Sequence, residues 1–237
     1  VPADAVRVCI GPVCDCLGAK DLLAREREHS TGFVLGVECL GHCDLAPVLT
    51  RGDVVEPTVS HRGNGFLVEP DDMRDPPEIA PDELLAALEE SGLTGMGGAG
   101  FPSWRKWDAV RREPGPRVVI VNADEGEPGT IKDRYVMELR PQLLLEGLVA
   151  AMRFCETDEA YIYLREEYAT SRAVLEDAIA ARGVPVRLVI GAGSYICGEE
   201  TAMLESMEGR RGMPRLRPPF PAQSGYLGRP TLINNVE

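Results

Sequence analysis

A glycine-rich stretch, Gly95-Met96-Gly97-Gly98-Ala99-Gly100-Phe101, offers the first chemistry in this sequence. Glycines lack a Cβ, so the backbone can adopt positive φ angles and bring its N–H groups close to a ligand. Lys106 follows the stretch, and residues 122–129, Asn-Ala-Asp-Glu-Gly-Glu-Pro-Gly, add amides and carboxylates a strand later. This combination predicts a site for a flat or phosphorylated ligand.

The same stretch satisfies the G-x-G-x-x-G spacing of dinucleotide-binding proteins, a pattern that requires a strand before the glycines and a helix after them. The preceding residues, Pro81 to Ser91, instead place Leu84, Leu85 and Leu88 on one helical face. The Rossmann interpretation therefore fails on context. Taken alone, the stretch would also be compatible with a glycine loop that only makes a tight connection.

Two pairs of cysteines near the N-terminus form a second candidate site. Cys9 and Cys14 are separated by four residues, and Cys39 and Cys43 by three. Two close pairs with a helix-sized interval between them allow two loops of a small α/β unit to present four thiolates to one metal centre. All-thiolate ligation favours a 2Fe-2S cluster, and neither pair has the two-residue gap usual for a zinc ribbon. A zinc site and structural thiols are the alternatives.

The elements that would position these cysteines fall in residues 1–68. We expect strands over residues 6–10 and 33–37, a helix over 18–28 and a hairpin over 48–55. A charged, proline-rich stretch follows, and we expect residues 69–81 to be a linker.

The remaining residues, 82–237, alternate strands and helices. We expect strands over 117–121, 160–164 and 186–190, and helices over 142–155, 171–182 and 199–208. This rhythm predicts an α/β sandwich with a largely parallel sheet. After Gly209, prolines at 214, 218, 219 and 221 forbid a helix, so we expect irregular structure there.

Composition excludes several classes of function. The 237 residues are 44% hydrophobic and 27% charged, as in soluble globular proteins, and the net charge of −13 argues against a nucleic-acid surface or docking to an anionic membrane. No apolar run is long enough to span a bilayer, and no signal peptide is visible. We therefore expect a cytoplasmic protein whose seven cysteines are metal ligands or core thiols.

The cysteine pattern resembles a known family. Cys9-x4-Cys14, followed by residues 38–47, Glu-Cys-Leu-Gly-His-Cys-Asp-Leu-Ala-Pro, resembles the thioredoxin-like 2Fe-2S ferredoxin domain found beside, or fused to, the NADH-oxidising subunit of respiratory complex I and its relatives. The resemblance implies that Cys9, Cys14, Cys39 and Cys43 ligate the cluster. The interval between the two pairs is shorter here than is usual in that family.

The second part of the chain resembles the NADH-binding, FMN-carrying subunit of complex I and the corresponding subunits of NAD-dependent formate dehydrogenases and NAD-linked hydrogenases. Four motifs carry this resemblance: residues 95–101, residues 122–130, residues 191–201, and residues 218–225 leading to 234–237. Each motif has an ordinary structural alternative, because turn formers end strands, phenylalanines fill cores and carboxylates favour helix N-termini. Four motifs in the same order are specific.

The resemblance implies a role for each residue of these motifs. Residues that would hold the FMN phosphate and one edge of the flavin are Gly95, Gly97, Gly98 and Lys106. Residues that would contact its ribityl chain and ring are Asn122, Asp124, Glu125, Gly198, Glu199, Asn234 and Asn235. Residues that would contact NADH are Phe101, Glu127, Glu200, Arg217 and Phe220, with Glu127 and Tyr195 as the catalytic pair near the hydride path.

Several features depart from the family pattern. Met96 stands where the family has arginine, Ala109 where it has an aromatic residue, and Arg217 where it has lysine. These departures affect the expected nucleotide binding more than the expected flavin binding. Family members also continue into a β-grasp-like domain and a 4Fe-4S helical domain, so we expect a fragment or a naturally short member, with another chain supplying the electron exit.

The fold class expected is therefore α/β, with a small thioredoxin-like ferredoxin domain followed by an α/β sandwich that binds FMN and NADH. The resemblance implies an NADH dehydrogenase of the diaphorase type, passing electrons between NAD(H), FMN and iron–sulfur clusters within a multisubunit complex. Expected partners are NADH and other iron–sulfur subunits, without nucleic acid and without direct membrane insertion. The alternatives are a catalytically idle iron–sulfur binding or docking module and a zinc-binding scaffold.

Overall fold

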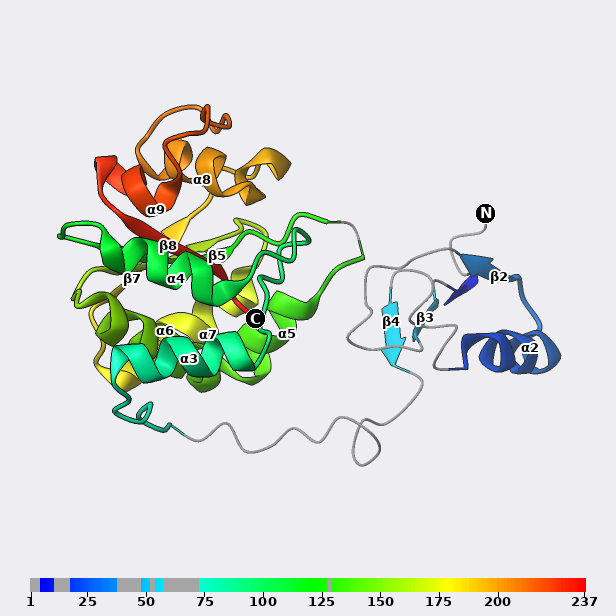
Figure 1. Cartoon of the computed structure of the whole chain (residues 1–237). Coiled ribbons are helices and arrows are strands. Elements are labelled where there is room, and N and C mark those ends of the chain that lie inside the picture. Colours follow the sequence, from blue (N-terminus) through cyan, green and yellow to red (C-terminus); the bar gives the residue numbers. More distant parts are fainter. Residues whose placement is uncertain (1–4, 11–17, 38–47, 52–53, 58–72, 128) are drawn as a thin grey trace. The chain divides into compact units, whose positions relative to one another are not determined.

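The computed structural model describes residues 5–10, 18–37, 48–51, 54–57, 73–127 and 129–237. The chain forms two compact units, an N-terminal unit of residues 1–67 and a C-terminal unit of residues 68–237. Each unit contains its own sheet (Figure 1).

The N-terminal unit has a four-stranded mixed sheet in the order β2-β1-β3-β4. Its strands and helix are β1 (Val6–Cys9), α2 (Ala19–His29), β2 (Val34–Val37), β3 (Val48–Arg51) and β4 (Val54–Pro57). Strand β1 is parallel to β2 and antiparallel to β3, and β3 and β4 form a hairpin. The expected strands, helix and hairpin are confirmed.

Apolar side chains of α2 and the sheet form the core of the N-terminal unit, with Val8, Leu22 and Leu49 buried together. Cys9 ends β1 and is 2% exposed. The other three predicted cluster ligands, Cys14, Cys39 and Cys43, lie outside the described residues.

The C-terminal unit is built on four parallel strands in the order β7-β6-β5-β8. These strands are β5 (Val118–Ala123), β6 (Ala160–Leu164), β7 (Val186–Ile190) and β8 (Thr231–Asn235). Every residue of β5 and β6 is buried, because a parallel sheet covered on both faces needs apolar side chains on both. The prediction of an α/β fold with a parallel sheet is confirmed.

The connections reverse direction at β5. From β5 the chain adds β6 and then β7 on one side, through α5 (Lys132–Leu139), α6 (Pro141–Cys155) and α7 (Ala169–Arg182). It then returns through η2 (Tyr195–Gly198), α8 (Glu200–Met207) and α9 (Pro221–Ser224) to place β8 on the other side of β5. Because parallel crossovers are right-handed, this reversal moves the connection to the opposite face of the sheet. The switch point of the topology lies between β5 and β8.

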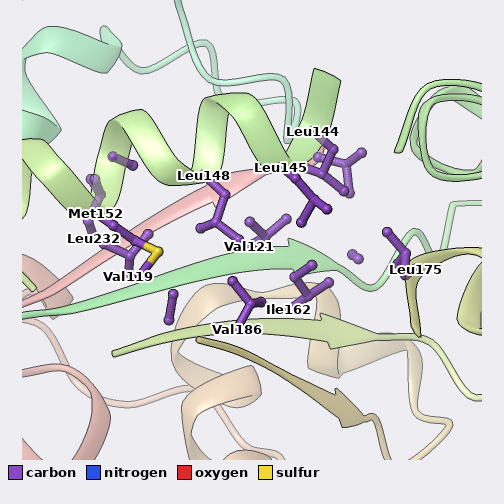
Figure 2. Close-up of a cluster of buried hydrophobic side chains, with 14 of the residues drawn as sticks. Val119, Val121, Leu144, Leu145, Leu148, Met152, Ile162, Leu175, Val186 and Leu232 are labelled. Carbon is purple, nitrogen blue, oxygen red and sulfur yellow. The ribbon is translucent and has the colours of Figure 1, made fainter. Parts of the chain in front are cut away.

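The larger core lies on the α6 face of the sheet. Figure 2 shows Leu144, Leu145, Leu148 and Met152 of α6 pointing onto strand residues that include Val121. Their spacing follows the helical repeat, so a single face of α6 supplies all four side chains.

The opposite face carries a smaller core, in which Ile120 of β5 and Tyr163 of β6 meet Cys197 of η2 and Met203 and Leu204 of α8. Strand β5 serves both cores, since its alternate residues point to opposite faces.

The structure corrects one expectation and adds elements that were not expected. Residues after Gly209 are not wholly irregular, because α9 begins at Pro221 and β8 pairs with β5. Proline is tolerated at the first position of a helix, and β8 completes the open side of β5 with apolar, β-branched residues. Two helices, α4 (Ser103–Arg112) and α5, were not expected, whereas α3 (Pro81–Glu90) was.

Residues 73–80 lie against the C-terminal unit although the sequence assigns them to the linker. Nη1 of Arg153 donates to the carbonyl of Pro76 at 2.7 Å, and Arg182 donates to the carbonyl of Arg74. Pro76 is buried. Among the described residues, no helix is long and apolar enough to cross a membrane.

Candidate functional site

The candidate site lies where β5 and β8 end. In open α/β sheets, ligands bind outside the carboxyl ends of the strands at the point where the strand order reverses. Strand β5 ends with Asn122 and Ala123, and β8 ends with Asn234 and Asn235. The register pairs Asn122 with Asn235. Thus the asparagines of two motifs, far apart in the sequence, meet at the switch point.

The glycine loop closes on itself beside β8. Thr94 and Pro102 form an isolated bridge, and the Gly95 amide donates to the Phe101 carbonyl at 2.8 Å. A Cβ on Gly97 would lie 3.0 Å from Oδ1 of Asn235, so the loop approaches the end of β8 closely. Gly98 has a φ of 92°, which favours glycine at that position.

Helix α4 begins directly after the glycine loop and carries Lys106 to the same strand end. Nζ of Lys106 donates to the carbonyl of Ile233 at 2.9 Å and lies 3.6 Å from Oε2 of Glu200. In the amide orientation that satisfies its hydrogen bonds, Asn234 donates to the same carbonyl and accepts from Nε1 of Trp107 at 3.1 Å. Lys106 is therefore anchored on β8 with its charge beside the loop.

The loop after β5 is braced against η2. Nδ2 of Asn122 donates to the carbonyl of Gly198 at 2.8 Å, and Oδ1 of Asn122 accepts from the amide of Asp124 at 3.1 Å. A Cβ on Gly198 would lie 3.0 Å from the carbonyl oxygen of Asp124. Burial raises the pKa of the Asp124 carboxyl to about 6, although the nearby Arg165 guanidinium opposes the shift.

Two of the predicted flavin-contacting carboxylates are hydrogen-bonded inside the protein. Glu125 is buried and accepts from the amides of Asp133 and Arg134 at 3.1 and 3.3 Å, which caps the first turn of α5, and from the hydroxyl of Tyr168 at 3.1 Å. Oε2 of Glu199 accepts from the first amides of α8 at 2.9 Å and caps that helix. Both carboxylates hold helices; their contacts with a flavin stay predictions.

Glu200 lies between two cations. Its Oε1 is 3.3 Å from Nη1 of Arg217, and its Oε2 is 3.6 Å from Nζ of Lys106. The three side chains are 26%, 41% and 28% exposed, so this group is open to solvent on one side. The structure thus brings together two residues that the sequence assigns to NADH and one that it assigns to FMN.

Several aromatic side chains are exposed around these groups. Tyr195 is 60% exposed and its hydroxyl donates to the carboxylate of Glu127, a bond that raises the pKa of the Tyr195 hydroxyl. Phe101, at the end of the glycine loop, is 49% exposed, and Phe220, at the start of α9, is 51% exposed. Because α9 packs against α4 and β8, the segment that carries Phe220 belongs to the same side of the sheet. Large exposed apolar rings of this kind are typical of binding surfaces.

Two residues at the site were not singled out from the sequence. Trp107 holds Asn234, and a signal was available, because a largely buried indole N–H needs an acceptor. Arg165 donates through Nη1 to the carbonyl of Glu125 at 3.0 Å, which no local pattern in the sequence indicates.

A cavity of about 480 Å³ lies beside η2 and is lined by residues that include Cys197, Arg211 and Met213. The glycine loop does not contribute to its lining. Within the described part of the chain, no group of three or more His, Cys, Asp or Glu side chains could hold a metal ion.

The residues present fit a flavin mononucleotide. Loop amides and the Lys106 ammonium are donors suited to a phosphate, and the amides of Asn122 and Asn235 are suited to hydroxyl groups. The close approach of Gly97 to Asn235 and of Gly198 to Asp124 leaves no room for side chains at these strand ends.

The parallel sheet, its switch point and the glycine loop define a class, the α/β domains that bind flavins and nucleotides at their strand ends. The family model described as the Nuo51 FMN-binding domain matches residues 88–237, and the chain belongs to this family.

Relatives at the sequence level are named as subunits of NADH-quinone oxidoreductase. The protein from Aquifex aeolicus (strain VF5) is 46% identical over 174 residues, which cover 67% of this chain and 41% of the relative. A protein of the same name from Rhizobium meliloti (strain 1021) is 48% identical over 176 residues, covering 68% of this chain and 42% of the relative. The chain therefore spans about two fifths of the length of these relatives.

The fold is also similar to a solved structure, the NAD+-reducing [NiFe]-hydrogenase in the H2-reduced state. The match has a TM-score of 0.69 and 32% sequence identity, and it covers 98% of this chain and 50% of that chain. The air-oxidized state of the hydrogenase gives a TM-score of 0.66 at 33% identity, covering 100% of this chain and 51% of that chain.

Proposed function

We propose that the C-terminal unit binds FMN at the carboxyl ends of β5 and β8, and that it serves there as an NADH-oxidising or NAD+-reducing module of a multisubunit complex. One observation carries this proposal: the glycine loop, Lys106 and the asparagines that end β5 and β8 come together at the switch point of the sheet. The family and the names of the relatives agree with it.

The chain's own residues would bind and orient the reactants. Lys106 and the amides of the glycine loop would hold the phosphate, and the strand-end asparagines would hold the ribityl hydroxyls. Phe101 and Phe220 offer apolar rings against which a nicotinamide nucleotide can stack. When bound, FMN would supply the exchange between a hydride and single electrons.

Two carboxylates would make polar contacts with the nucleotide. Glu200, held between Lys106 and Arg217, keeps one side toward solvent and can accept from ribose hydroxyls. The Glu127 carboxylate and the Tyr195 hydroxyl, already hydrogen-bonded, would lie beside the transferred hydride and fix the carboxamide.

We also propose that the N-terminal unit carries a 2Fe-2S cluster on Cys9, Cys14, Cys39 and Cys43. Cys9 is buried at the end of β1, and the similarity to the hydrogenase chain extends over nearly the whole of this chain. Electrons would then pass between this cluster, FMN and other iron–sulfur subunits. The cytoplasmic location stays a prediction from the sequence.

The proposal is tested by an anaerobic absorbance spectrum of the purified chain, reconstituted with FMN, before and after NADH is added. The expected result is a flavin band near 450 nm that bleaches, with iron and sulfide each near two per chain. Absence of a flavin band while iron and sulfide are retained would contradict the flavin role and favour an idle iron–sulfur docking module.

A matched pair of glycine variants tests the position of the site. Gly97→Val places a side chain against Asn235, whereas a Cβ on Gly147, within α6, meets no atom within 4 Å. Gly97→Val is expected to weaken FMN binding by about tenfold or more, because overpacking displaces the loop. Gly147→Val should bind FMN as the unchanged chain does, and equal losses in both variants would contradict the proposed position.

A further inference from the structure

The segment between α8 and β8, residues 209–228, carries two of the residues expected at the nucleotide, Arg217 and Phe220. Its regular structure consists of the short helix α9 and the single turn η3 (Tyr226–Gly228). Such a long connection does not fix the position of its side chains by local structure alone. What holds this segment in place therefore decides where Arg217 and Phe220 lie.

Arg215 ties three parts of the molecule together. Its Nε donates to Oε1 of Glu205 at 2.5 Å and its Nη2 to Oε1 of Glu208 at 2.8 Å, both at the end of α8. Its Nη1 donates to the carbonyl of Gly225 at 2.9 Å, near the far end of the segment. Its backbone amide donates to Oγ1 of Thr201 at 2.9 Å, in the first turn of α8.

The two carboxylates that receive Arg215 are poorly exposed. The side chain of Glu208 is 5% exposed and that of Glu205 is 17% exposed. Oε1 of Glu208 also accepts from the amide of Leu227 at 2.8 Å, so the same carboxylate holds a second point of the segment. Charge-assisted hydrogen bonds with little solvent access are stronger than exposed ion pairs.

The carbonyl that Arg215 holds belongs to a tightly packed turn. A Cβ on Gly225 would lie 2.3 Å from Oγ1 of Thr231 and 2.8 Å from the carbonyl oxygen of Pro221. The Gly225 amide donates to the carbonyl of Arg229 at 2.7 Å, directly before β8. The contact from Arg215 to Gly225 thus joins the middle of the segment to the sheet.

We propose that Arg215 is a positioning residue for nucleotide binding: it clamps residues 209–228 between α8 and β8, and so presets Arg217 and Phe220. Arg217 follows two residues later and reaches Glu200 at the start of the same helix, at 3.3 Å. Arg215 itself does not touch the ligand and acts through Arg217 and Phe220. This inference rests on the proposed NAD(H) function.

The chain offers a matched control in Arg210. Arg210 pairs with the same carboxylates, Glu205 and Glu208, but its side chain is 56% exposed and its contacts are to these two residues. Removing either arginine leaves the other to neutralise the carboxylates. Arg215→Gln removes the clamp, whereas Arg210→Gln removes a similar charge without it.

The experiment compares steady-state NADH oxidation by the FMN-loaded full chain with an artificial electron acceptor. Arg215→Gln is expected to raise KM for NADH about tenfold, with kcat and FMN content unchanged, because a charge-assisted anchor for remote binding groups is lost. Arg210→Gln should change KM less than twofold. Arg215→Lys should stay close to Arg215→Gln, since one ammonium cannot reach Glu205, Glu208 and Gly225 together.

Amide hydrogen exchange provides a readout that does not need activity. Exchange in residues 216–224 should rise in Arg215→Gln and not in Arg210→Gln. Equal KM changes in the two variants, or unchanged exchange in Arg215→Gln, would overturn the clamp. If the unchanged chain shows no NADH-dependent bleaching of FMN, the proposed function and the nucleotide part of this inference both fall, and exchange alone decides whether Arg215 holds the segment.

Discussion

The two ends of the parallel sheet in the C-terminal unit use their ionisable side chains differently. At the amino end, Arg117 precedes β5 and its guanidinium donates to four carbonyls near the C-terminal ends of α4 and α6. The acceptors and distances are Val110 at 3.2 Å, Arg111 at 2.8 Å, Glu113 at 2.9 Å and Cys155 at 3.3 Å. These helix ends have carbonyls without partners in their own helices, and Arg117 satisfies them.

A second group at the amino end is equally occupied. Arg229, before β8, donates to both carboxylate oxygens of Glu159, before β6, at 2.5 and 2.9 Å. The Tyr161 hydroxyl donates to the same carboxylate at 2.6 Å. The polar groups of this end are therefore used to join neighbouring strands and helices.

At the carboxyl end, comparable groups keep part of their hydrogen-bonding capacity toward solvent. Lys106, Glu200 and Arg217 are each more than a quarter exposed, and Tyr195 is 60% exposed. The difference indicates that the amino end maintains the fold, whereas the carboxyl end is the side available to ligands. Glu125 is the informative exception, because it lies at the carboxyl end and yet caps α5.

The largest effect is expected at the amino end, from Arg117→Met. The substitution leaves four helix-end carbonyls without their donor, and we expect the free energy of unfolding to fall by about 3 kcal/mol. Arg172→Met is the control, because Arg172 makes an exposed ion pair with Glu176 four residues away and should cost less than about 0.5 kcal/mol. Denaturant unfolding measures both, and similar losses would contradict the structural role of Arg117.

An intermediate and opposite effect is expected beside the carboxyl end, from Asp133→Asn. Burial raises the pKa of Asp133 from 3.8 to about 6, although the hydrogen bond from Lys132 opposes the shift. The folded protein therefore binds this proton more tightly than the unfolded chain, and the ionised carboxylate costs stability that is absent below pH 3.8 and complete above about pH 6.

Relative to the unchanged chain, Asp133→Asn should thus be about 2 kcal/mol more stable at pH 8 than it is at pH 4. The difference between the two pH values cancels any constant cost of the amide. Free energies of unfolding measured at both pH values test this, and a difference that is independent of pH would show that the carboxyl does not titrate with a raised pKa.

The smallest effect is expected from Glu159→Gln at the amino end, with the opposite dependence on pH. Hydrogen bonding from Arg229 is the largest cause that lowers the pKa of Glu159 from 4.5 to about 2. Its contribution is present above pH 4.5 and is lost as the pH falls toward 2. Because the side chain is 36% exposed, we expect the substitution to cost less than about 1 kcal/mol at pH 7. Thermal unfolding at pH 7 and pH 3 checks whether this loss shrinks in acid.

The sequence predicted elements best where the apolar pattern was complete. Strands β6 and β7 have the expected bounds, since each is a compact run of apolar or β-branched residues between turn signals. Helices α4 and α5 were missed because few of their residues are buried, such as Trp107 and Val110 in α4. Strand β8 was missed because prolines dominate the residues before it, whereas its pairing depends on β5, more than a hundred residues earlier.

The motifs alone determined which residue types gather at the candidate site and, through the family resemblance, which ligand they suit. Only the tertiary structure decided how each side chain is used. Lys106 bonds to Ile233 at a separation of 127 residues, and Asn122 to Gly198 at a separation of 76. Glu199 caps α8 while its neighbour Glu200 faces two cations. Local sequence specifies propensity and chemistry, but the partner of a polar group depends on which distant segments the sheet brings together.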